Sequence, residues 1–442
     1  MTTTYDPFHP RYFDEADLRE EMVRVYDLCH GCRLCFKFCS AFPTMFAAID
    51  NHDDQDAAKL TTAEQDQVVD ECFNCKLCYV NCPYIPGQHE WELDFPRLML
   101  RAEQTLHRKQ GRRTVSVALT DQALGRTDLA GKAATALAPL ANKAIATPGS
   151  RARKAMEKVT GIASQRVLPP YAKTRFSTWW KKRTALRAPA EEKQGSALLF
   201  PTCLVEYQSP QVGKDLVRVM ERNGIDCDVP AGQVCCGAPW LHSGDVESFR
   251  KQGRKNVKVL ADAIREAIGR GEKPAVVVPQ PTCGYVLKYD YKDYLGGTDA
   301  ELVAEHTYDA AEYLMKVHKA EGTSLDTEFS GPVPEKVTYH APCHLRAQNV
   351  GLKSRDLMKL TGAKITVVAE CSGIDGTWGY RAENYEMSRN VAKKMAAAIG
   401  KADGDVVAGD CHLANGGIVQ ETGREPVHPV SLVARAYGIP EE

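Results

Sequence analysis

The first hundred residues carry apolar side chains at helical spacing. The apolar residues that recur at intervals of three and four positions are Leu18, Met22, Val25 and Tyr26. This spacing places side chains on one face of an α-helix, so it predicts a helix that leads into Cys29. Thr61 and Glu64 have the spacing of a capping box, which predicts a second helix that runs to Cys72. We therefore expect a helical domain over residues 15–100.

From about residue 196, short apolar strands alternate with helices, and each of four strands is followed by a cysteine. These strand-and-cysteine segments are 196–203, 275–283, 337–343 and 405–411. The second half repeats the order of the first, which predicts two related α/β units over residues 196–325 and 326–442. Because α/β folds build their sites at the carboxyl ends of strands, we expect these thiols along one edge.

The segment between these regions, residues 101–195, has no cysteine and is strongly basic. The net charge of the whole chain is −1. Residues 101–187 nevertheless hold 19 Lys and Arg against 4 Asp and Glu, whereas residues 1–100 hold 8 against 18. Such segregation is typical of a segment that meets a negatively charged surface. We predict a basic helical linker with a membrane contact.

Two adjacent tryptophans close the basic segment. Trp179 and Trp180 precede three cations, Lys181, Lys182 and Arg183. Indoles beside Lys and Arg suit the membrane–water interface. The alternative is a solvated linker whose tryptophans pack on a neighbouring domain, and both interpretations stay open. No groove-reading motif accompanies the charge, so we do not expect nucleic-acid binding.

The overall composition is that of an ordinary soluble protein. A chain of 442 residues predicts two or three domains. No stretch approaches the run of about 20 apolar residues that a spanning helix needs. The acidic start is unlike a signal peptide. The cysteines follow metal-ligand patterns, which fits a reducing compartment, so we predict a cytoplasmic protein, peripheral on the inner face of the cell membrane.

Eight of the sixteen cysteines form two runs that both read C-x₂-C-x₂-C-x₃-C. In this spacing three thiolates reach three corners of one cluster, and the fourth cysteine ligates the other cluster. The predicted ligand sets are Cys29, Cys32, Cys35 with Cys82, and Cys72, Cys75, Cys78 with Cys39. Two structural zinc sites are the alternative, but zinc sites usually use two pairs of ligands. The runs therefore predict two [4Fe–4S] clusters.

Three cations lie inside the runs. They are Arg33, Lys37 and Lys76. Positive charge beside a cluster favours its reduced, more negative state.

The Cys-Cys-Gly sequence at 235–237 and its partner cysteines resemble the CCG domains of the heterodisulfide reductase B-subunit family. With the two ferredoxin-type runs in front, the chain resembles the iron–sulfur subunits of the anaerobic glycerol-3-phosphate dehydrogenase and glycolate oxidase type. The resemblance covers residues 18–100 and 196–442. It implies an α+β fold, in which a helical two-cluster ferredoxin-like domain is followed by the basic helical linker and two related α/β CCG repeats.

The resemblance implies a third Fe–S cluster in the first CCG repeat. Its four ligands would be Cys203, Cys235, Cys236 and Cys283. Gln280 stands where the family pattern has a further cysteine, which excludes a five-cysteine noncubane site. Zinc and vacant thiols are the alternatives.

The second CCG repeat departs further from the family pattern. Ser372 replaces one of its cysteines and Ala408 another. The predicted metal ligands that remain are Cys343, Cys371 and Cys411, with His344 as an imidazole beside them. Such a set suits zinc or a histidine-ligated cluster. In the alternative, the histidines pack and the cysteines are vestigial. Trp378 is expected to line the same edge.

No glycine fingerprint for a dinucleotide follows a strand, and no P-loop is present. We therefore expect a partner that carries the hydride-accepting cofactor. The predicted function is an electron-transfer subunit, which relays electrons from a flavoprotein dehydrogenase of the 2-hydroxy acid or glycerol-3-phosphate class to quinone or another acceptor. The alternative is an enzyme like heterodisulfide reductase that reduces a disulfide at the CCG sites. No catalytic residue is assigned.

Overall fold

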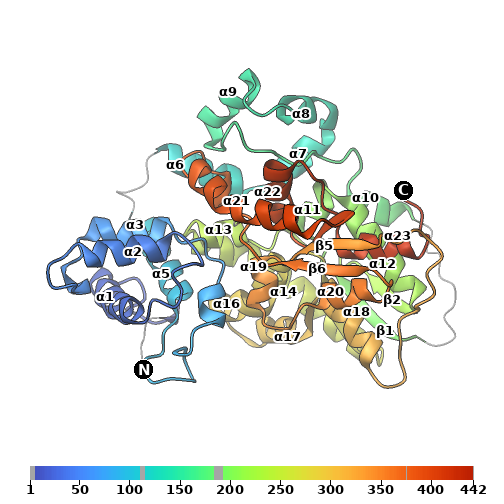
Figure 1. The fold of residues 1–442 in the computed structure, drawn as a ribbon. Helices are drawn as coiled ribbons and strands as arrows, with labels where there is room; N and C mark the ends of the chain where they lie inside the picture. The colour runs from blue at the N-terminus through green and yellow to red at the C-terminus, as the bar shows by residue number, and fades with distance from the viewer. Residues whose placement is uncertain (1–4, 110–114, 184–192, 375, 442) are drawn as a thin grey trace.

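The computed structural model describes residues 5–109, 115–183, 193–374 and 376–441 (Figure 1). It consists of a helical N-terminal region, a helical middle region and two small parallel sheets surrounded by helices. Parts of the predicted basic segment, 110–114 and 184–192, lie outside the described residues. Across the described ranges, no helix combines the length and the apolar character that a bilayer-spanning segment needs.

The N-terminal region is helical, as its apolar pattern predicts. Its elements are α1 Glu15–Cys32, α2 Ala41–Asp50, the 3-10 turn η2 Ala57–Lys59, α3 Thr62–Asp70, α4 Leu77–Val80 and α5 Phe95–Arg108. The fully buried residues of α1 include Leu18, Met22, Val25 and Tyr26. The predicted capping box of Thr61 and Glu64 is present at the start of α3. Helix α5 continues past residue 100, the expected end of the helical domain. It does so because its apolar face packs in the same core as α1.

The described part of the middle region consists of short helices packed on the α/β units. They are α6 Val115–Gly125, α7 Thr127–Ala136, α8 Ala138–Ile145, α9 Arg151–Thr160 and α10 Phe176–Lys182. In Figure 1, α8 and α9 project from the body of the molecule. Arg166 is fully buried, and it donates hydrogen bonds to the carbonyl of Gly379 (2.5 Å) and the hydroxyl of Ser388 (2.8 Å). The region is therefore anchored to the second α/β unit.

The two tryptophans of α10 pack against the first α/β unit. Trp179 and Trp180 are half-buried against the core that contains Phe176, which is fully buried. The guanidinium of Arg183 lies 5.3 Å and 4.8 Å from their ring centroids. Trp179 and Trp180 thus pack on a neighbouring domain, as the alternative interpretation predicts. They do not project from the protein as a membrane anchor would.

The first α/β unit contains a parallel sheet with the strand order β2-β1-β3-β4. The strands are β1 Gly195–Leu199, β2 Ile225–Asp228, β3 Pro274–Val278 and β4 Thr307–Asp309. The helices are α11 Thr202–Tyr207, α12 Pro210–Arg222, α13 Ala238–His242, α14 Val246–Gly269, α15 Pro281–Tyr285, the π-helical turn η3 Val286–Asp290, α16 Tyr291–Leu295, α17 Thr298–His306 and α18 Ala310–Lys319. Strand β3 is wholly buried, which fits its continuous apolar run.

The second α/β unit contains a parallel sheet with the order β6-β5-β7. The strands are β5 Lys336–His340, β6 Lys364–Val368 and β7 Val406–Gly409. The helices are α19 Cys343–Ala347, α20 Lys353–Lys359, the 3-10 turn η4 Trp378–Tyr380, α21 Tyr385–Ala402, α22 His412–Thr422 and α23 Pro429–Ala436. Helix α23 packs on α12, and its Val430 and Val433 join the core of the first unit. The two units thus share a core.

The cysteines of both units follow the carboxyl ends of strands. Those after β1, β3, β5, β6 and β7 are, in order, Cys203, Cys283, Cys343, Cys371 and Cys411. Cys235 and Cys236 come directly before α13, where Gly237 has a φ of 93°. A side chain is strained at that φ, and a Cβ there would also come within 2.9 Å of the Phe249 ring. The expected gathering of thiols at strand ends is confirmed.

Candidate iron–sulfur sites

The thiols of the first run lie together with the last cysteine of the second run. Burial, and then the neighbouring thiols of Cys35, Cys82 and Cys32, raise the pKa of Cys29 well above its ordinary value. Burial and the thiols of Cys82 and Cys32 likewise raise the pKa of Cys35 to about 12. Thiols this close resist ionisation unless a cation is present, and iron is such a cation.

The second set combines the triplet of the second run with the last cysteine of the first. Burial and the thiols of Cys72 and Cys75 raise the pKa of Cys39, and Cys78 responds in the same way to Cys75, Cys72 and Cys39. The last cysteine of each run thus has thiols of the other run as neighbours, which is compatible with the crossed sets expected from the spacing. All sixteen cysteines of the chain are free thiols. Two sets of four free thiols fit two [4Fe–4S] clusters in donor type and number.

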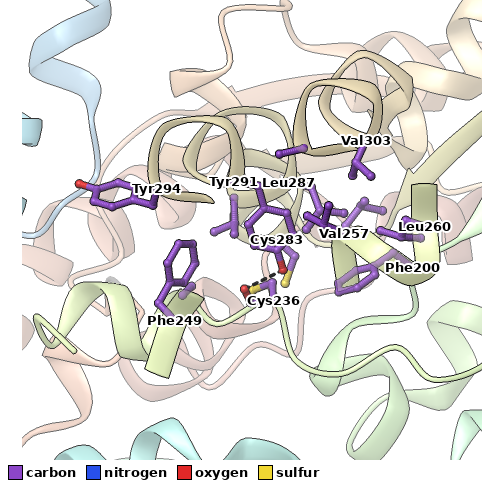
Figure 2. Close-up of a cluster of buried hydrophobic side chains, with 14 of the residues drawn as sticks. Phe200, Cys236, Phe249, Val257, Leu260, Cys283, Leu287, Tyr291, Tyr294 and Val303 are labelled. Carbon is purple, nitrogen blue, oxygen red and sulfur yellow. Dashed lines mark hydrogen bonds between the residues drawn. The ribbon is translucent and has the colours of Figure 1, made fainter. Parts of the chain in front are cut away.

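The four thiols of the first CCG repeat form one buried cluster. Hydrogen bonds from the thiols of Cys203 and Cys236 lower the pKa of Cys235 well below its ordinary value. Cys236 in turn contacts Cys283, and Figure 2 shows these two side chains next to each other. The hydroxyl of Tyr291 donates to the carbonyl oxygen of Cys236 at 2.9 Å (Figure 2). This donor set fits a further Fe–S cluster.

Helix α7 of the middle region completes the first CCG site. The backbone amide of Cys235 donates to Oδ2 of Asp128 at 2.9 Å. After the neighbouring thiols, the hydroxyl of Thr127 also helps to lower the pKa of Cys235. Asp128 accepts a further hydrogen bond from the hydroxyl of Tyr207 at 3.2 Å. Sequence reasoning missed these residues, because a linker of basic and apolar residues gives no signal that its helix covers a distant strand end.

The cysteines of the second CCG repeat lie against the second ferredoxin-type set. A small cavity is lined by Cys343, Cys371 and Cys411 together with Cys75. Trp378 packs on Phe73 with 4.5 Å between ring centroids, and its Nε1 donates to the carbonyl of Asp70 at 2.7 Å. The loop of Trp378 therefore fastens the second repeat to the N-terminal region.

His344 lies beside these thiols, but both of its ring nitrogens have protein partners. Nδ1 is 3.2 Å from the hydroxyl of Thr282 and 3.9 Å from the sulfur of Cys343. Nε2 is 3.4 Å from Nζ of Lys76. Burial, followed by the charge of Lys76, lowers the pKa of His344, so its ring is neutral. These bonds favour His344 as part of the wall of the site.

Another imidazole of the second repeat has a nitrogen without a partner. His340 lines the same cavity, its Nε2 lies 3.0 Å from the carbonyl of Glu370, and its buried Nδ1 has no hydrogen-bond partner among the described residues. Among those residues, no three His, Cys, Asp or Glu side chains converge as the ligands of one metal ion do. The same holds for the ferredoxin-type sets and the first CCG set, so this finding does not distinguish zinc from a cluster.

Gln280 connects the two repeats. Its Nε2 donates to the sulfur of Cys411 at 3.3 Å, and its Oε1 accepts from the amide of His412 at 3.2 Å. The residue that replaces a family cysteine in the first repeat thus lies against a thiol of the second repeat. Cys411 is also near Cys283, whose charge contributes to the raised pKa of Cys411, after burial.

The four cysteine sets follow one another through the molecule. Cys35 of the first set neighbours Cys75 of the second. Cys75 lines a cavity with the cysteines of the second CCG repeat, and Cys411 of that repeat neighbours Cys283 of the first CCG repeat. The cysteines of the second CCG repeat therefore neighbour both the second ferredoxin-type set and the first CCG set, although this repeat comes last in the sequence. The first α/β unit also contacts the N-terminal region directly, since Arg97 pairs with Asp293.

The three cations of the runs have different environments. Lys76 is buried, with Nζ 3.0 Å from the carbonyl of Asn74 and 4.8 Å from the ring centroid of Tyr285. Arg33 is exposed and paired with Asp50 at 2.5 Å, and Lys37 is exposed. Only the charge of Lys76 acts from inside the protein.

Comparison with protein-family models finds domains of two kinds. A 4Fe-4S dicluster domain matches residues 21–95. The cysteine-rich CCG domain matches twice, at residues 197–288 and 337–413. These ranges contain the cysteine sets described above.

Three curated relatives match this chain over half of its length or more. The C-subunit of anaerobic glycerol-3-phosphate dehydrogenase from Escherichia coli strain K12 is 31% identical over 325 residues, which cover 73% of this chain and 78% of the relative. The B-subunit of fumarate reductase (CoM/CoB) from Methanothermobacter marburgensis is 31% identical over 226 residues, 50% of this chain and 41% of the relative. Lactate utilization protein A of Shouchella clausii is 28% identical over 239 residues, which cover 51% of this chain and 92% of the relative. With its dicluster domain, its two CCG domains and this coverage, the chain belongs to the family of iron–sulfur electron-transfer subunits that includes the C-subunit of anaerobic glycerol-3-phosphate dehydrogenase.

Proposed function

We propose that this protein carries electrons from a flavoprotein dehydrogenase along its four cysteine sets, in their spatial order, to quinone or another acceptor. The observation that supports this route is that Cys35 neighbours Cys75, that Cys75 and Cys411 line one cavity, and that Cys411 neighbours Cys283. Electron transfer needs redox centres near one another, and a line of adjacent sites meets that need. The route begins at the first run and ends at the first CCG repeat.

The cofactors in this proposal are Fe–S clusters, which supply one-electron transfer when bound. Two [4Fe–4S] clusters would be held by the crossed ferredoxin-type sets, and a third cluster by the first CCG set. In the second CCG repeat, Cys343, Cys371 and Cys411 would hold a further centre. The buried Nδ1 of His340, which has no partner among the described residues, makes His340 the imidazole best placed to assist.

The donor in this proposal is a dehydrogenase of the glycerol-3-phosphate or 2-hydroxy acid class. The names of the relatives support this choice, since one belongs to a glycerol-3-phosphate dehydrogenase and another is a lactate utilization protein. The donor would bring the flavin.

The acceptor would approach the first CCG site through a neighbouring cleft. This cleft has a volume of about 320 Å³ and lies beside Val234 and Asp128, next to Cys235. The cations that line it are Arg126, Lys251 and Lys255, and the indole of Trp240 forms a wall. Positive charge around an acceptor stabilises the negative charge that develops when the acceptor is reduced. A quinone head group fits such a cleft.

A peripheral membrane contact is the role that we propose for the helices α7, α8 and α9 of the middle region. Their exposed large apolar residues, 58–68% accessible, are Leu129, Leu137, Leu140 and Val159. Apolar side chains among basic ones bind the surface of anionic bilayers. The leucines, and not Trp179 and Trp180, would enter the interface. Leu129 also lines the acceptor cleft, which would bring the cleft to the membrane.

The order of the sites can be tested in the second CCG repeat. Cys343→Ser should leave the ferredoxin-type clusters reducible by the dehydrogenase but slow the delivery of electrons to the first CCG cluster. Stopped-flow reduction of the anaerobic full-length protein, with EPR of frozen samples, distinguishes the clusters. Cys227→Ser is the matched control, because this thiol on β2 belongs to none of the sets. Unchanged delivery in the Cys343→Ser protein would contradict the route.

A further inference from the structure

The two ferredoxin-type runs build similar loops in different surroundings. Arg33 in the first run and Lys76 in the second occupy equivalent positions, and both have left-handed backbone conformations, with φ of 52° and 62°. Leu34 and Leu77 are likewise equivalent, each directly before the third cysteine of its run. The loops can therefore be compared position by position.

The loop of the second run is covered by another part of the protein. Cys75 is 9% exposed and Leu77 is 7% exposed. The second CCG repeat covers them, with Cys343, Cys371 and Trp378 in the same apolar cluster. This covered loop is where one redox site meets the next.

The equivalent loop of the first run is uncovered. Cys32 is exposed, Leu34 is 53% exposed and Phe36 is 58% exposed. One face of Phe36 stacks on Phe46, with 6.3 Å between centroids, and the rest of the ring remains accessible. Two large apolar side chains beside an exposed cluster ligand are the composition of an interface core.

We propose that the flavin-bearing subunit of the dehydrogenase docks on Cys32, Leu34 and Phe36, as the second CCG repeat docks on Cys75 and Leu77. This inference rests on the proposed function and assigns its entry point. Each electron would leave the reduced flavin and pass to the cluster that the first cysteine set would hold, while the protons of the flavin pass to solvent.

The charge of the N-terminal region indicates which kind of partner binds this surface. Residues 1–100 carry 18 acidic against 8 basic side chains. Arg33 and Lys37 are exposed in the loop itself, but the region as a whole is acidic and would repel an anionic bilayer. A second copy that docked through the same surface would bring like charges together. A redox partner with a basic rim is complementary to this surface.

Photo-crosslinking from position 34 identifies the occupant. The full-length protein, with p-benzoylphenylalanine in place of Leu34, is irradiated in the cells that produce it with its native complex. The expected product is a crosslink to a polypeptide that carries flavin, identified by mass spectrometry and flavin absorbance. A crosslink to a second copy of this chain, to lipid only, or to no polypeptide would overturn the proposal.

A double substitution tests the energetics of the same surface. Leu34→Glu with Phe36→Glu should weaken binding of the purified flavoprotein by about tenfold or more, since such anchors carry much of an interface's affinity. Reduction by dithionite, which needs no docking surface, should still go to completion and shows that the clusters are intact. Ile268→Glu is the matched control, because Ile268 is 47% exposed on α14, outside all the cysteine sites.

The outcomes separate this inference from the proposed function. If the wild-type protein takes no electrons from any flavoprotein, the proposed function fails. If the wild type takes them and the Leu34→Glu, Phe36→Glu protein does so with equal affinity and rate, only the docking surface is wrong.

Discussion

At the scale of single residues, the chemistry of the relay depends on a few thiols and one buried cation. Cys75 has a special position, since it belongs to the second ferredoxin-type set and also lines the cavity of the second CCG repeat. Lys76, the next residue, carries its charge inside the protein.

Replacing Cys75 by Ser should remove the second cluster and spare the first. A serine hydroxyl remains protonated where a thiol ionises, so the second set would keep only three thiolates. The first set uses other cysteines and should stay filled. Iron and sulfide quantification after anaerobic preparation should fall by about four of each per chain. Loss of both clusters, or zinc in place of iron, would contradict the assignment.

Replacing Lys76 by Met should make the second cluster harder to reduce. A buried cation at about 8 Å stabilises an added negative charge by on the order of 2 kcal/mol at an effective dielectric constant of 20. Redox titration followed by EPR should show a more negative potential. Lys37→Met is the control, because exposed charges are screened by salt and by water. An equal shift in both variants would argue against a specific role of Lys76.

At the scale of elements, helix α7 makes the middle region part of the first CCG site and not only a connection between domains. At its start, the carboxylate of Asp128 accepts a hydrogen bond from the backbone amide of Cys235. Gly131, one turn later, lies so close to the Tyr207 ring that a Cβ would come within 2.4 Å of it. The helix is thus held close to the first CCG repeat at two points.

Replacing Asp128 by Ala should destabilise the first CCG site. Its carboxylate accepts hydrogen bonds from the Cys235 amide and from Tyr207, and leaving such donors unpaired costs about 1–3 kcal/mol. Asp128→Asn keeps an acceptor oxygen and should be milder. The measurements are thermal unfolding and the EPR signal of the first CCG cluster. Equal behaviour of the Ala variant and the wild type would contradict this role of α7.

At the scale of the whole molecule, the two ends of the site series have opposite character. The acidic N-terminal region presents an exposed cluster ligand and two exposed apolar residues, Leu34 and Phe36. The other end presents a cleft lined by cations beneath basic helices with exposed leucines. This polarity suits a protein that lies between a protein donor and an acceptor at a membrane.

Binding to anionic vesicles should depend on the exposed leucines of α7, α8 and the junction between them. Each cation near such a surface contributes about 1 kcal/mol, which salt weakens, and the buried leucines should leave a salt-resistant part. Co-sedimentation with phosphatidylglycerol vesicles should lose that part in the variant Leu129→Ser, Leu137→Ser, Leu140→Ser. Ile268→Ser is the control. No binding of the wild type at low salt would mean that these helices serve a protein partner.

Local sequence determined many structural features of this protein, because the strongest signals in the sequence act over a few residues. The cysteine spacing of the two runs indicates which thiols share a cluster, and the burial of Leu18, Met22, Val25 and Tyr26 follows from helical periodicity. Strand ends followed by Cys203, Cys283, Cys343 and Cys411 were predictable for the same reason. Turn chemistry, helical period and ligand reach extend over about three to ten positions, so a single sequence records them.

Contacts between distant segments were decided only by the tertiary structure. The sequence does not show that the cysteines of the second CCG repeat neighbour both other groups of cysteines, that Gln280 bonds to Cys411, or that α7 covers Cys235. For Trp179 and Trp180, a membrane interface and a protein core favour the same amphipathic side chains, so sequence left both open and packing chose the core. Likewise Leu34 and Leu77 are the same residue in the same motif. Whether each is exposed depends on what the rest of the chain brings over it.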